Sequence, residues 1–391
     1  MSEARINRIS NESGTGGPIL SGITTFSGLN YFVPPKGTTA ERPSNAPPGS
    51  LRFNTDSAHI EYFDGLQWLD FEAFNVEIGI STAAAPASSG TGHRGVFGGG
   101  DNPSDQSRLD FITISSLGNS IQFGSLTDAR TALSACSSST RAVFCGGYLS
   151  TETITDFVTF SSGGSATSFG NLTLSGTSRI FTASLSSSTR GITAGGTTSL
   201  SAPGTLTNVI DYITIASQGN SQDFGDLTSS RYNGASCASS TRGIFGGGYG
   251  AVGSNRTNTI EYVTISTLGN AIRFGSLDAV YSHVRGCSNA TRGIFAAGFN
   301  PTMTNTIQFI TIASTGNTQD FGDLTSVRVQ PSSCSSPTRG VFIGGNEPSS
   351  RVNTIDCVNI MTTGNSLDFG DMNTASPAAA QGACSNGHGG L

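Results

Sequence analysis

The chain has 391 residues, of which 52 are glycine and only 12% are charged, and its formal net charge is -6 at pH 7. Lys36 is the only lysine, so no basic stripe exists to neutralise phosphates, and we expect no nucleic-acid partner. No apolar run approaches the ~20 residues that cross a bilayer, and residues 1–6 lack the layout of a secretory signal. We therefore expect no membrane insertion, and synthesis in a cytosol where the seven cysteines stay thiols.

The first 79 residues differ in composition from the rest of the chain. Residues 1–50 are rich in proline, serine, threonine and glycine, which predicts an extended arm without a core of its own. Residues 51–79 predict a small β meander with strands at 51–55, 59–63 and 67–71 and turns at 56–57 and 64–65. Three strands of this length are marginal alone, so we expect them to need a partner surface, either the following domain or another copy.

From residue 80 onward the chain contains an internal repeat. An Arg-Gly-aliphatic-Phe-Gly-Gly pattern, or a close variant of it, recurs at intervals of 47 to 52 residues. It begins at Arg94, Arg141, Arg190, Arg242, Arg292 and Arg339. A period near fifty residues is typical of one blade of a β-propeller.

Each repeat contains four segments with the pattern of strands. In one repeat they are residues 232–237, 242–247, 259–265 and 271–277, and the third alternates apolar with polar residues. A Gly-Asn pair, or Gly163-Gly164 in the second repeat, separates the third and fourth segments and suits a tight hairpin turn. Six such units predict an all-β fold in which residues 80–391 form a six-bladed β-propeller, because a ring of blades removes long exposed edges.

Three further recurring features lead to structural predictions. A phenylalanine precedes a glycine in every fourth strand, and we expect it to pack between neighbouring blades. Acidic residues recur in the third strand, at Asp110, Asp156, Asp211, Glu261 and Asp356, with Gln308 at that position in the fifth repeat. This pattern predicts one arginine–carboxylate contact per blade with the six arginines above. Both residues 83–89 and residues 378–384 have the pattern of a first strand, and we expect the C-terminal copy to complete the ring because Pro86 weakens its competitor.

The repeat resembles the kelch repeat over roughly residues 80–391. Arg231, the segment 244–247 and the Glu261-Tyr262 pair carry the resemblance, whereas Phe274 stands where kelch repeats usually have tryptophan. The resemblance implies a propeller and identifies no particular partner.

A second resemblance lies in the N-terminal region. Residues 17–28, 41–43, 49–56 and 62–68 are similar to N-terminal segments of structural proteins of tailed bacteriophages, especially those of marine cyanobacteria. Such segments join fibres or appendages to the virion, so the resemblance implies a virion protein assembled in the host cytoplasm. The expected contacts with other virion proteins are Ile19, Leu20, Ile23, Phe26, Tyr31 and Phe32. A homo-oligomer is expected, and a trimer would suit an appendage.

Few residues suggest catalysis. Only four histidines exist, and although His93 and His388 occupy equivalent repeat positions that could meet at the closure, no tyrosine pair accompanies them as in propeller copper oxidases. We therefore expect no catalytic residue, metal or cofactor. Five cysteines lie at one repeat position, Cys136, Cys237, Cys287, Cys334 and Cys384, and are predicted to be small buried hydrophobes.

The connections between second and third strands vary in length and sequence, and recognition is often built on such loops. Their candidate ligand-binding residues are Tyr148, Tyr249, Arg256, Phe299, Asn300 and Asn346. These side chains suit a sugar or a protein neighbour, although plain solvated loops of drifting repeats explain the variation equally well. The resulting hypothesis is a tail or fibre protein whose propeller binds a host-surface glycan or a neighbouring virion protein. Alternatives are a purely architectural capsid or neck decoration protein, and a carbohydrate-active or oxidative enzyme that uses the central pocket.

Overall fold

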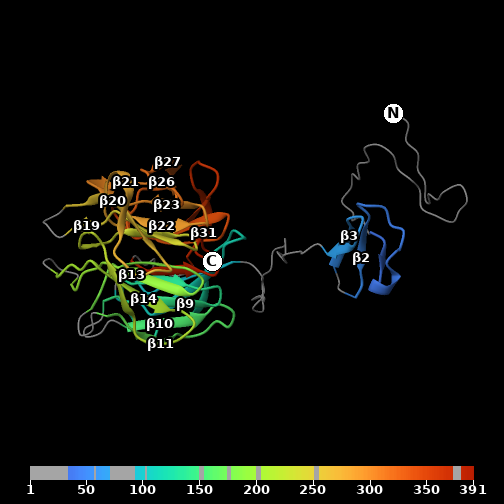
Figure 1. Cartoon of the computed structure of the whole chain (residues 1–391), viewed down its shortest axis with the longest axis horizontal. Coiled ribbons are helices and arrows are strands. Elements are labelled where there is room, and N and C mark those ends of the chain that lie inside the picture. Colours follow the sequence, from blue (N-terminus) through green and yellow to red (C-terminus); the bar gives the residue numbers. More distant parts are fainter. Residues whose placement is uncertain are drawn as a thin grey trace, which may run out of the picture. The chain divides into compact units, whose positions relative to one another are not determined.

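The computed structural model describes residues 34–56, 59–70, 93–101, 104–148, 154–173, 178–199, 204–250, 255–372 and 380–391. The chain divides into two compact units, Met1–Asn75 and Val76–Leu391 (Figure 1). The described residues form strands and one short 3-10 helix, so the fold is all-β, and none of their helices has the length and hydropathy of a membrane span. The expected attachment residues between Ile19 and Phe32 lie outside the described residues, as do residues 83–89.

The second unit contains six four-stranded antiparallel sheets, here named I to VI. Sheet I consists of β32 (Gly382–Ser385), β5 (Arg94–Gly98), β6 (Arg108–Thr113) and β7 (Ile121–Ser125). Sheet II consists of β8 (Ser134–Ser137), β9 (Arg141–Cys145), β10 (Ile154–Thr159) and β11 (Thr167–Asn171). Sheet III consists of β12 (Ala183–Ser186), β13 (Arg190–Ala194), β14 (Val209–Thr214) and β15 (Gln222–Asp226). Sheet IV consists of β17 (Ala235–Ala238), β18 (Arg242–Gly246), β20 (Thr257–Thr264) and β21 (Ile272–Tyr281). Sheet V consists of β22 (Arg285–Ser288), β23 (Arg292–Ala296), β26 (Thr306–Thr311) and β27 (Gln319–Asp323). Sheet VI consists of β28 (Ser332–Ser335), β29 (Arg339–Ile343), β30 (Thr354–Asn359) and β31 (Leu367–Asp371). Two short pairs lie beside them, β16 (Arg231–Tyr232) with β19 (Tyr249–Gly250), and β24 (Phe299–Asn300) with β25 (Thr302–Met303).

The predicted four strands per repeat are confirmed. The C-terminal segment also forms a first strand, as expected. Strand β32 pairs with β5, with Cys384 opposite Val96, so the last segment of the chain supplies the first strand of sheet I. In Figure 1 the colours run from green in β9–β11 to red in β31, following the sheets in chain order.

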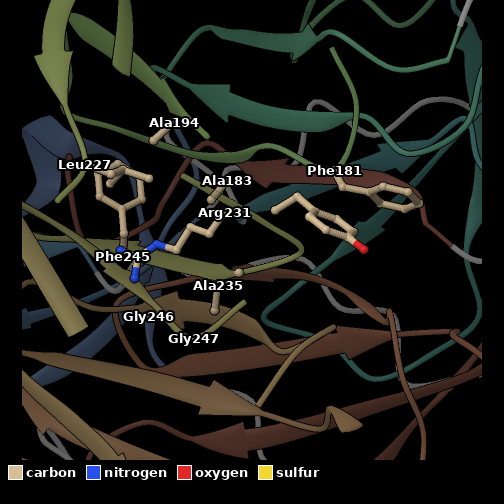
Figure 2. Close-up of a pocket in the computed structure, with 11 residues that line it drawn as sticks. Phe181, Ala183, Ala194, Leu227, Arg231, Ala235, Phe245, Gly246 and Gly247 are labelled. Atoms are coloured by element: carbon tan, nitrogen blue, oxygen red, sulfur yellow. The ribbon is translucent and has the colours of Figure 1, made fainter. Parts of the chain in front are cut away.

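The hydrophobic core is divided into clusters that each join two consecutive sheets. Phe169 of sheet II packs with Ile213 and Ile215 of sheet III, and Phe369 of sheet VI packs with Ile112 of sheet I. The prediction that this phenylalanine packs between sheets is confirmed. A small gap remains between sheets III and IV, lined by Phe181 and Arg231 among others (Figure 2).

The in-register cysteines pack against glycines of the next sheet. A Cβ built on Gly293 would lie 2.5 Å from Cys237 Sγ, and one on Gly340 would lie 2.7 Å from Cys287 Sγ. All seven cysteines are free and buried, as predicted for small hydrophobes. Burial raises the pKa of the Cys287 thiol to about 12, so this sulfur stays protonated at neutral pH.

The Gly-Asn pairs bind consecutive sheets together. The Gly219 amide donates to the Phe169 carbonyl at 2.8 Å, and the Asn220 side-chain oxygen accepts from the Asn171 amide at 3.0 Å. The same contact joins sheets VI and I, where the Gly118 amide donates to the Phe369 carbonyl at 2.8 Å. These pairs were predicted only as hairpin turns, and the structure adds a contact between sheets.

The predicted partners of the third-strand carboxylates were wrong. Arg141 lies opposite Thr159, which is three residues from Asp156. Three residues span about 10 Å along a strand, so Arg141 is too far from Asp156 for an ion pair. The six second-strand arginines instead donate to carbonyls of the following sheet, as Arg141 does to Ile215 at 3.1 Å and Arg339 of sheet VI does to Ile114 of sheet I at 3.0 Å.

A different arginine series, just before the first strands, binds four of the five carboxylates, whereas Asp110 of sheet I pairs with Arg108 of its own strand at 2.8 Å. Its ion pairs are Arg130–Asp156, Arg179–Asp211, Arg231–Glu261 and Arg328–Asp356. Each of these side chains is at most 4% exposed, and the arginines also donate to backbone carbonyls. In sheet V both partners are exchanged together, for Tyr281 and Gln308.

The first unit contains one small sheet in the order β1-β2-β3-β4. Strands β2 (Leu51–Asn54), β3 (His59–Phe63) and β4 (Trp68–Asp70) form the predicted meander, and β1 (Lys36–Gly37) adds a parallel strand beside β2. The helix η1 (Thr39–Glu41) follows β1.

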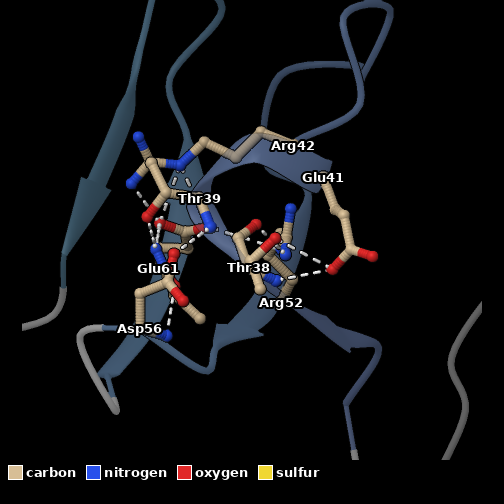
Figure 3. A network of polar contacts seen from close by, with 8 residues as sticks. Thr38, Thr39, Glu41, Arg42, Arg52, Asp56 and Glu61 are labelled. Carbon is tan, nitrogen blue, oxygen red and sulfur yellow. Dashed lines mark hydrogen bonds and ion pairs between the residues drawn. The ribbon is translucent and has the colours of Figure 1, made fainter.

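The polar side chains of this sheet, rather than its apolar ones, are buried. Glu61 is fully buried and accepts from Arg42 Nη2 at 2.6 Å, while Arg52 Nε lies 3.3 Å from it (Figure 3). The hydrogen bond from Arg42 lowers the pKa of Glu61. In contrast, Leu51 is 53% and Ile60 44% exposed. The sheet therefore keeps apolar surface exposed, which fits the expected need for a partner.

Candidate functional site

The residue two positions before the start of each first strand has a left-handed backbone. These residues are Ala132, Phe181, Asn233, His283, Gln330 and Ala380, with φ between 54° and 60°. Their amides donate to one another in sequence: Ala132 to Ala380 (3.0 Å), Phe181 to Ala132 (2.8 Å), Asn233 to Phe181 (3.0 Å), His283 to Asn233 (2.9 Å) and Gln330 to His283 (3.2 Å). Because this conformation costs a non-glycine residue about 1–2 kcal/mol, the hydrogen bonds explain how it is held. We call these residues the positive-φ set.

The first strands of all six sheets line a cavity. Serine, alanine and cysteine side chains line it, and serine hydroxyls link neighbouring strands, as Ser137 Oγ does to the Ser385 carbonyl at 2.7 Å. The C-terminal residues contact the last residues of these strands: His388 Nε2 donates to the Ser137 carbonyl at 3.0 Å, and the Gly389 amide donates to that of Ser288. The chain therefore covers one end of the cavity with its own C-terminus.

A serine and a histidine meet in this cavity, but their hydrogen bonds do not suit nucleophilic catalysis. Ser186 Oγ lies 3.2 Å from His388 Nε2. Since Nε2 donates to Ser137 and Nδ1 accepts from the Gly390 amide at 3.1 Å, the proton is assigned to Nε2, which cannot then take one from serine. Burial lowers the pKa of His388 to about 4, so the imidazole is neutral at pH 7.

Of the two histidines expected at the closure, His93 lies beside the segment that contains His388. A Cβ on Gly387 would lie 2.1 Å from His93 Nδ1, so His93 packs against the C-terminal segment. In the described part of the chain, no group of three or more His, Cys, Asp or Glu side chains is arranged to hold a metal ion.

Three of the six predicted loop residues come together. The Arg256 guanidinium carbon lies 5.3 Å from the centre of the Tyr249 ring and 4.5 Å from that of Phe299, and Arg256 Nη2 donates to the Tyr249 hydroxyl at 3.2 Å. Tyr249 and Phe299 begin the short strands β19 and β24, which hold the two rings on neighbouring sheets.

The other three predicted residues are not part of this contact. Asn300 follows Phe299 in β24. Tyr148 belongs to the connection of sheet II and is 40% exposed, and Asn346 belongs to that of sheet VI and donates to Gln330 Oε1 at 3.3 Å. The predicted set therefore divides among separate parts of the surface.

Sequence reasoning missed three aromatic residues of the same cluster. Tyr232 stacks on Tyr249 with ring centres 5.3 Å apart, His283 meets Tyr249 edge-on at 5.5 Å, and Phe181 lies 6.1 Å from Tyr232. Phe181 and His283 belong to the positive-φ set, whose side chains vary although its position in the repeat does not. That variation at a fixed position is the signal that could have identified them. We call Phe181, Tyr232, Tyr249, Arg256, His283 and Phe299, together with Arg285, whose charge lowers the pKa of His283, the arginine–aromatic cluster.

The cluster carries positive charge that no carboxylate balances. Neither Arg256 nor Arg285 forms an ion pair with any described residue, unlike the buried arginines before other first strands. Burial, and then the charges of Arg285 and Arg256, lower the pKa of His283 to about 3, so this imidazole is neutral. Burial lowers the pKa of Arg285 only to about 10, so it stays charged at pH 7.

The gap between sheets III and IV offers no comparable chemistry. Its walls are mostly alanine, glycine and apolar side chains, and its charged residue, Arg231, already pairs with Glu261 at 3.0 Å (Figure 2). Among the described surfaces, the arginine–aromatic cluster is the better candidate for binding. Comparison with models of known protein families finds no match to this chain, and comparison with curated proteins finds none either.

Proposed function

We propose that the six sheets are the blades of a six-bladed, kelch-like β-propeller. Three kinds of contact support this arrangement, because each follows the order of the sheets and also joins sheet VI to sheet I. They are the shared hydrophobic clusters, the Gly-Asn contacts and the arginine–carbonyl bonds, as between Arg339 and Ile114. The cavity lined by all six first strands then lies on the propeller axis.

We further propose that the protein is a structural component of a tailed-phage virion, with a tail or fibre location, and that its propeller binds a host-surface glycan. The N-terminal sequence pattern supports the virion assignment, and the small sheet adds a reason for a partner, since Leu51 and Ile60 stay exposed. The observation that carries glycan binding is the arginine–aromatic cluster, in which the Arg256 guanidinium, without a carboxylate partner among the described residues, lies against the rings of Tyr249 and Phe299.

A capsid or neck decoration protein is the alternative, and it differs in location and in lacking a ligand. The enzyme hypothesis receives no support from Ser186 and His388, because the imidazole proton is on the nitrogen that faces the hydroxyl.

Deletion of residues 1–33 tests the virion assignment while keeping β1 and the Arg42–Glu61 pair. The truncated protein should be absent from purified virions when it competes with the full chain, yet should still bind host cells when purified. Incorporation at the level of the full chain would contradict attachment through the arm. Absence of the full chain itself from virions would refute the virion assignment.

A further inference from the structure

We propose that the arginine–aromatic cluster binds the acidic group, a carboxylate or a sulfate, of a saccharide. This inference rests on the proposed glycan binding and names the class of glycan.

The first argument is the way in which Arg256 is held. Its guanidinium carbon lies 5.3 Å from the centre of the Tyr249 ring and 4.5 Å from that of Phe299, and Nη2 donates to the Tyr249 hydroxyl. Its Nε is buried without a hydrogen-bond partner. A guanidinium that is oriented by aromatic contacts before binding loses little freedom when it binds an oxyanion, and its planar donors match a carboxylate or a sulfate.

The second argument is the lack of any charge partner for Arg285. This arginine begins β22 and donates to the backbone carbonyl of Val284 at 3.0 Å. The equivalent positions in the other sheets hold small residues: Ser134, Ala183, Ala235, Ser332 and Gly382. A partly buried charge without a partner is costly, and none of the repeated structural contacts uses it. An anionic ligand would supply the missing partner.

The third argument separates a saccharide from other anions. Tyr232 and Tyr249 stack on each other, and the ring of Phe299 also contacts Arg256, so apolar ring surfaces lie next to the charge. All of them are half-buried, as expected for a binding surface on loops. The formal net charge of -6 works against a long polyanion such as nucleic acid, whereas one acidic sugar needs only local positive charge. An acidic peptide shares the anionic group and is therefore included in the test.

The experiment compares full-length protein with Arg256→Gln, Arg285→Gln and the control Arg273→Gln. Arg273 is exposed on β21 and donates to Ser276 Oγ at 2.9 Å, so its replacement removes the same charge away from the cluster. The probes are glucuronate-containing and sulfated oligosaccharides, their neutral counterparts of equal length, and an oligoglutamate peptide, with affinity measured by titration calorimetry at two salt concentrations.

The wild type should bind the acidic saccharides at least tenfold more tightly than the neutral ones. Arg256→Gln and Arg285→Gln should each weaken that binding by about tenfold or more, which is the usual effect of losing one hydrogen bond to a charged group. Arg273→Gln should bind like the wild type.

Three results would overturn the inference: equal affinity for acidic and neutral saccharides, equal loss in all three variants, or tighter binding of the peptide. Saturation-transfer NMR from tyrosine rings to the sugar gives a second readout on the wild type that does not depend on the folding of a variant, and absence of transfer would also count against the site. Binding of neutral host glycan alone would leave the proposed function standing while excluding an acidic ligand. Absence from virions would refute the virion assignment without affecting this titration.

Discussion

The buried ion pair Arg231–Glu261 can be tested against the solution that sheet V uses at the same position. Sheet V has Tyr281 for the arginine and Gln308 for the carboxylate. Gln308 Oε1 accepts from the Asp278 amide at 3.0 Å, much as Glu261 accepts from the Thr228 amide at 3.3 Å. The double variant Arg231→Tyr/Glu261→Gln therefore transfers a pair that this fold already accommodates.

The magnitude follows from the burial of the two charges. Arg231 is 4% exposed and Glu261 is fully buried, with Nη2 and Oε2 3.0 Å apart. Removing one partner leaves the other charge buried and unpaired, which costs about 3–5 kcal/mol of unfolding free energy. If the two changes were independent, the double variant would lose about 6–10 kcal/mol. We expect it to lose at most about 3 kcal/mol, the usual limit for a volume change in a packed interior, because neither charge remains.

Urea denaturation followed by circular dichroism on the wild type, both single variants and the double variant measures this coupling. The double variant should have a higher denaturation midpoint than either single variant. A double variant at least as unstable as the sum of the single losses would refute the reasoning, since the pair would then not act as one replaceable unit.

Three further predictions concern the contacts between sheets, the C-terminus and the cysteines. Gly275→Ala should lower the melting temperature, because the added Cβ would lie 1.9 Å from the Gly316 carbonyl oxygen. Gly316→Ala, whose Cβ meets no atom within 4 Å, should lower it much less. Equal decreases in melting temperature, measured by calorimetry, would contradict this. Since the folded pKa of His388 is lowered to about 4, its contribution to stability should be complete above about pH 6.5 and be lost as the pH falls toward 4. Protection of the C-terminal amides from hydrogen exchange should fall over that range in the wild type and not in His388→Gln, and pH-independent protection in the wild type would exclude this role. All seven cysteines should resist a thiol reagent until the protein unfolds, and rapid reaction of any one in the native protein would contradict the burial of that side chain.

The strands, including the one that the C-terminal segment adds beside β5, could be predicted because their signals are local. A repeat period near fifty and alternating apolar residues fix which segments form strands, and Gly382–Ser385 has the same pattern as the other first strands. Pairing between side chains is different, because two arginine series recur with the same period. Only strand register, with Arg141 opposite Thr159, decides which series reaches Asp156.

The sequence did contain one signal for the correct pairing. In the fifth repeat Gln308 replaces the acid, and Tyr281 replaces the arginine that lies six residues before the first-strand cysteine. Arg292 of the second strand is retained in the same repeat. An arginine that remains when its supposed partner disappears is unlike an ion-pair partner. Comparing the repeats position by position would thus have identified the second series.

The candidate site was predictable only in part. The loop residues Tyr249, Arg256 and Phe299 were identified from variation in length and sequence. Tyr232 and His283 were not, because they lie close to the first strands and outside the variable connections. Their contact with Tyr249 depends on connections from consecutive sheets, a relation that the linear sequence does not display.

Because the six repeats perform the same structural tasks, a departure in one of them can be tested against the other five. The exchange to Tyr281 and Gln308 replaces an ion pair with a hydrogen-bonded neutral group, so a structural explanation is sufficient there. Arg285 is a departure of another kind, since five sheets use a small residue at its position and no described carboxylate balances its charge. Both Arg285 and Arg256 are close enough to His283 to lower its pKa. A structural explanation would have to account for two uncompensated charges in one sector, whereas an anionic ligand accounts for both through a single interaction.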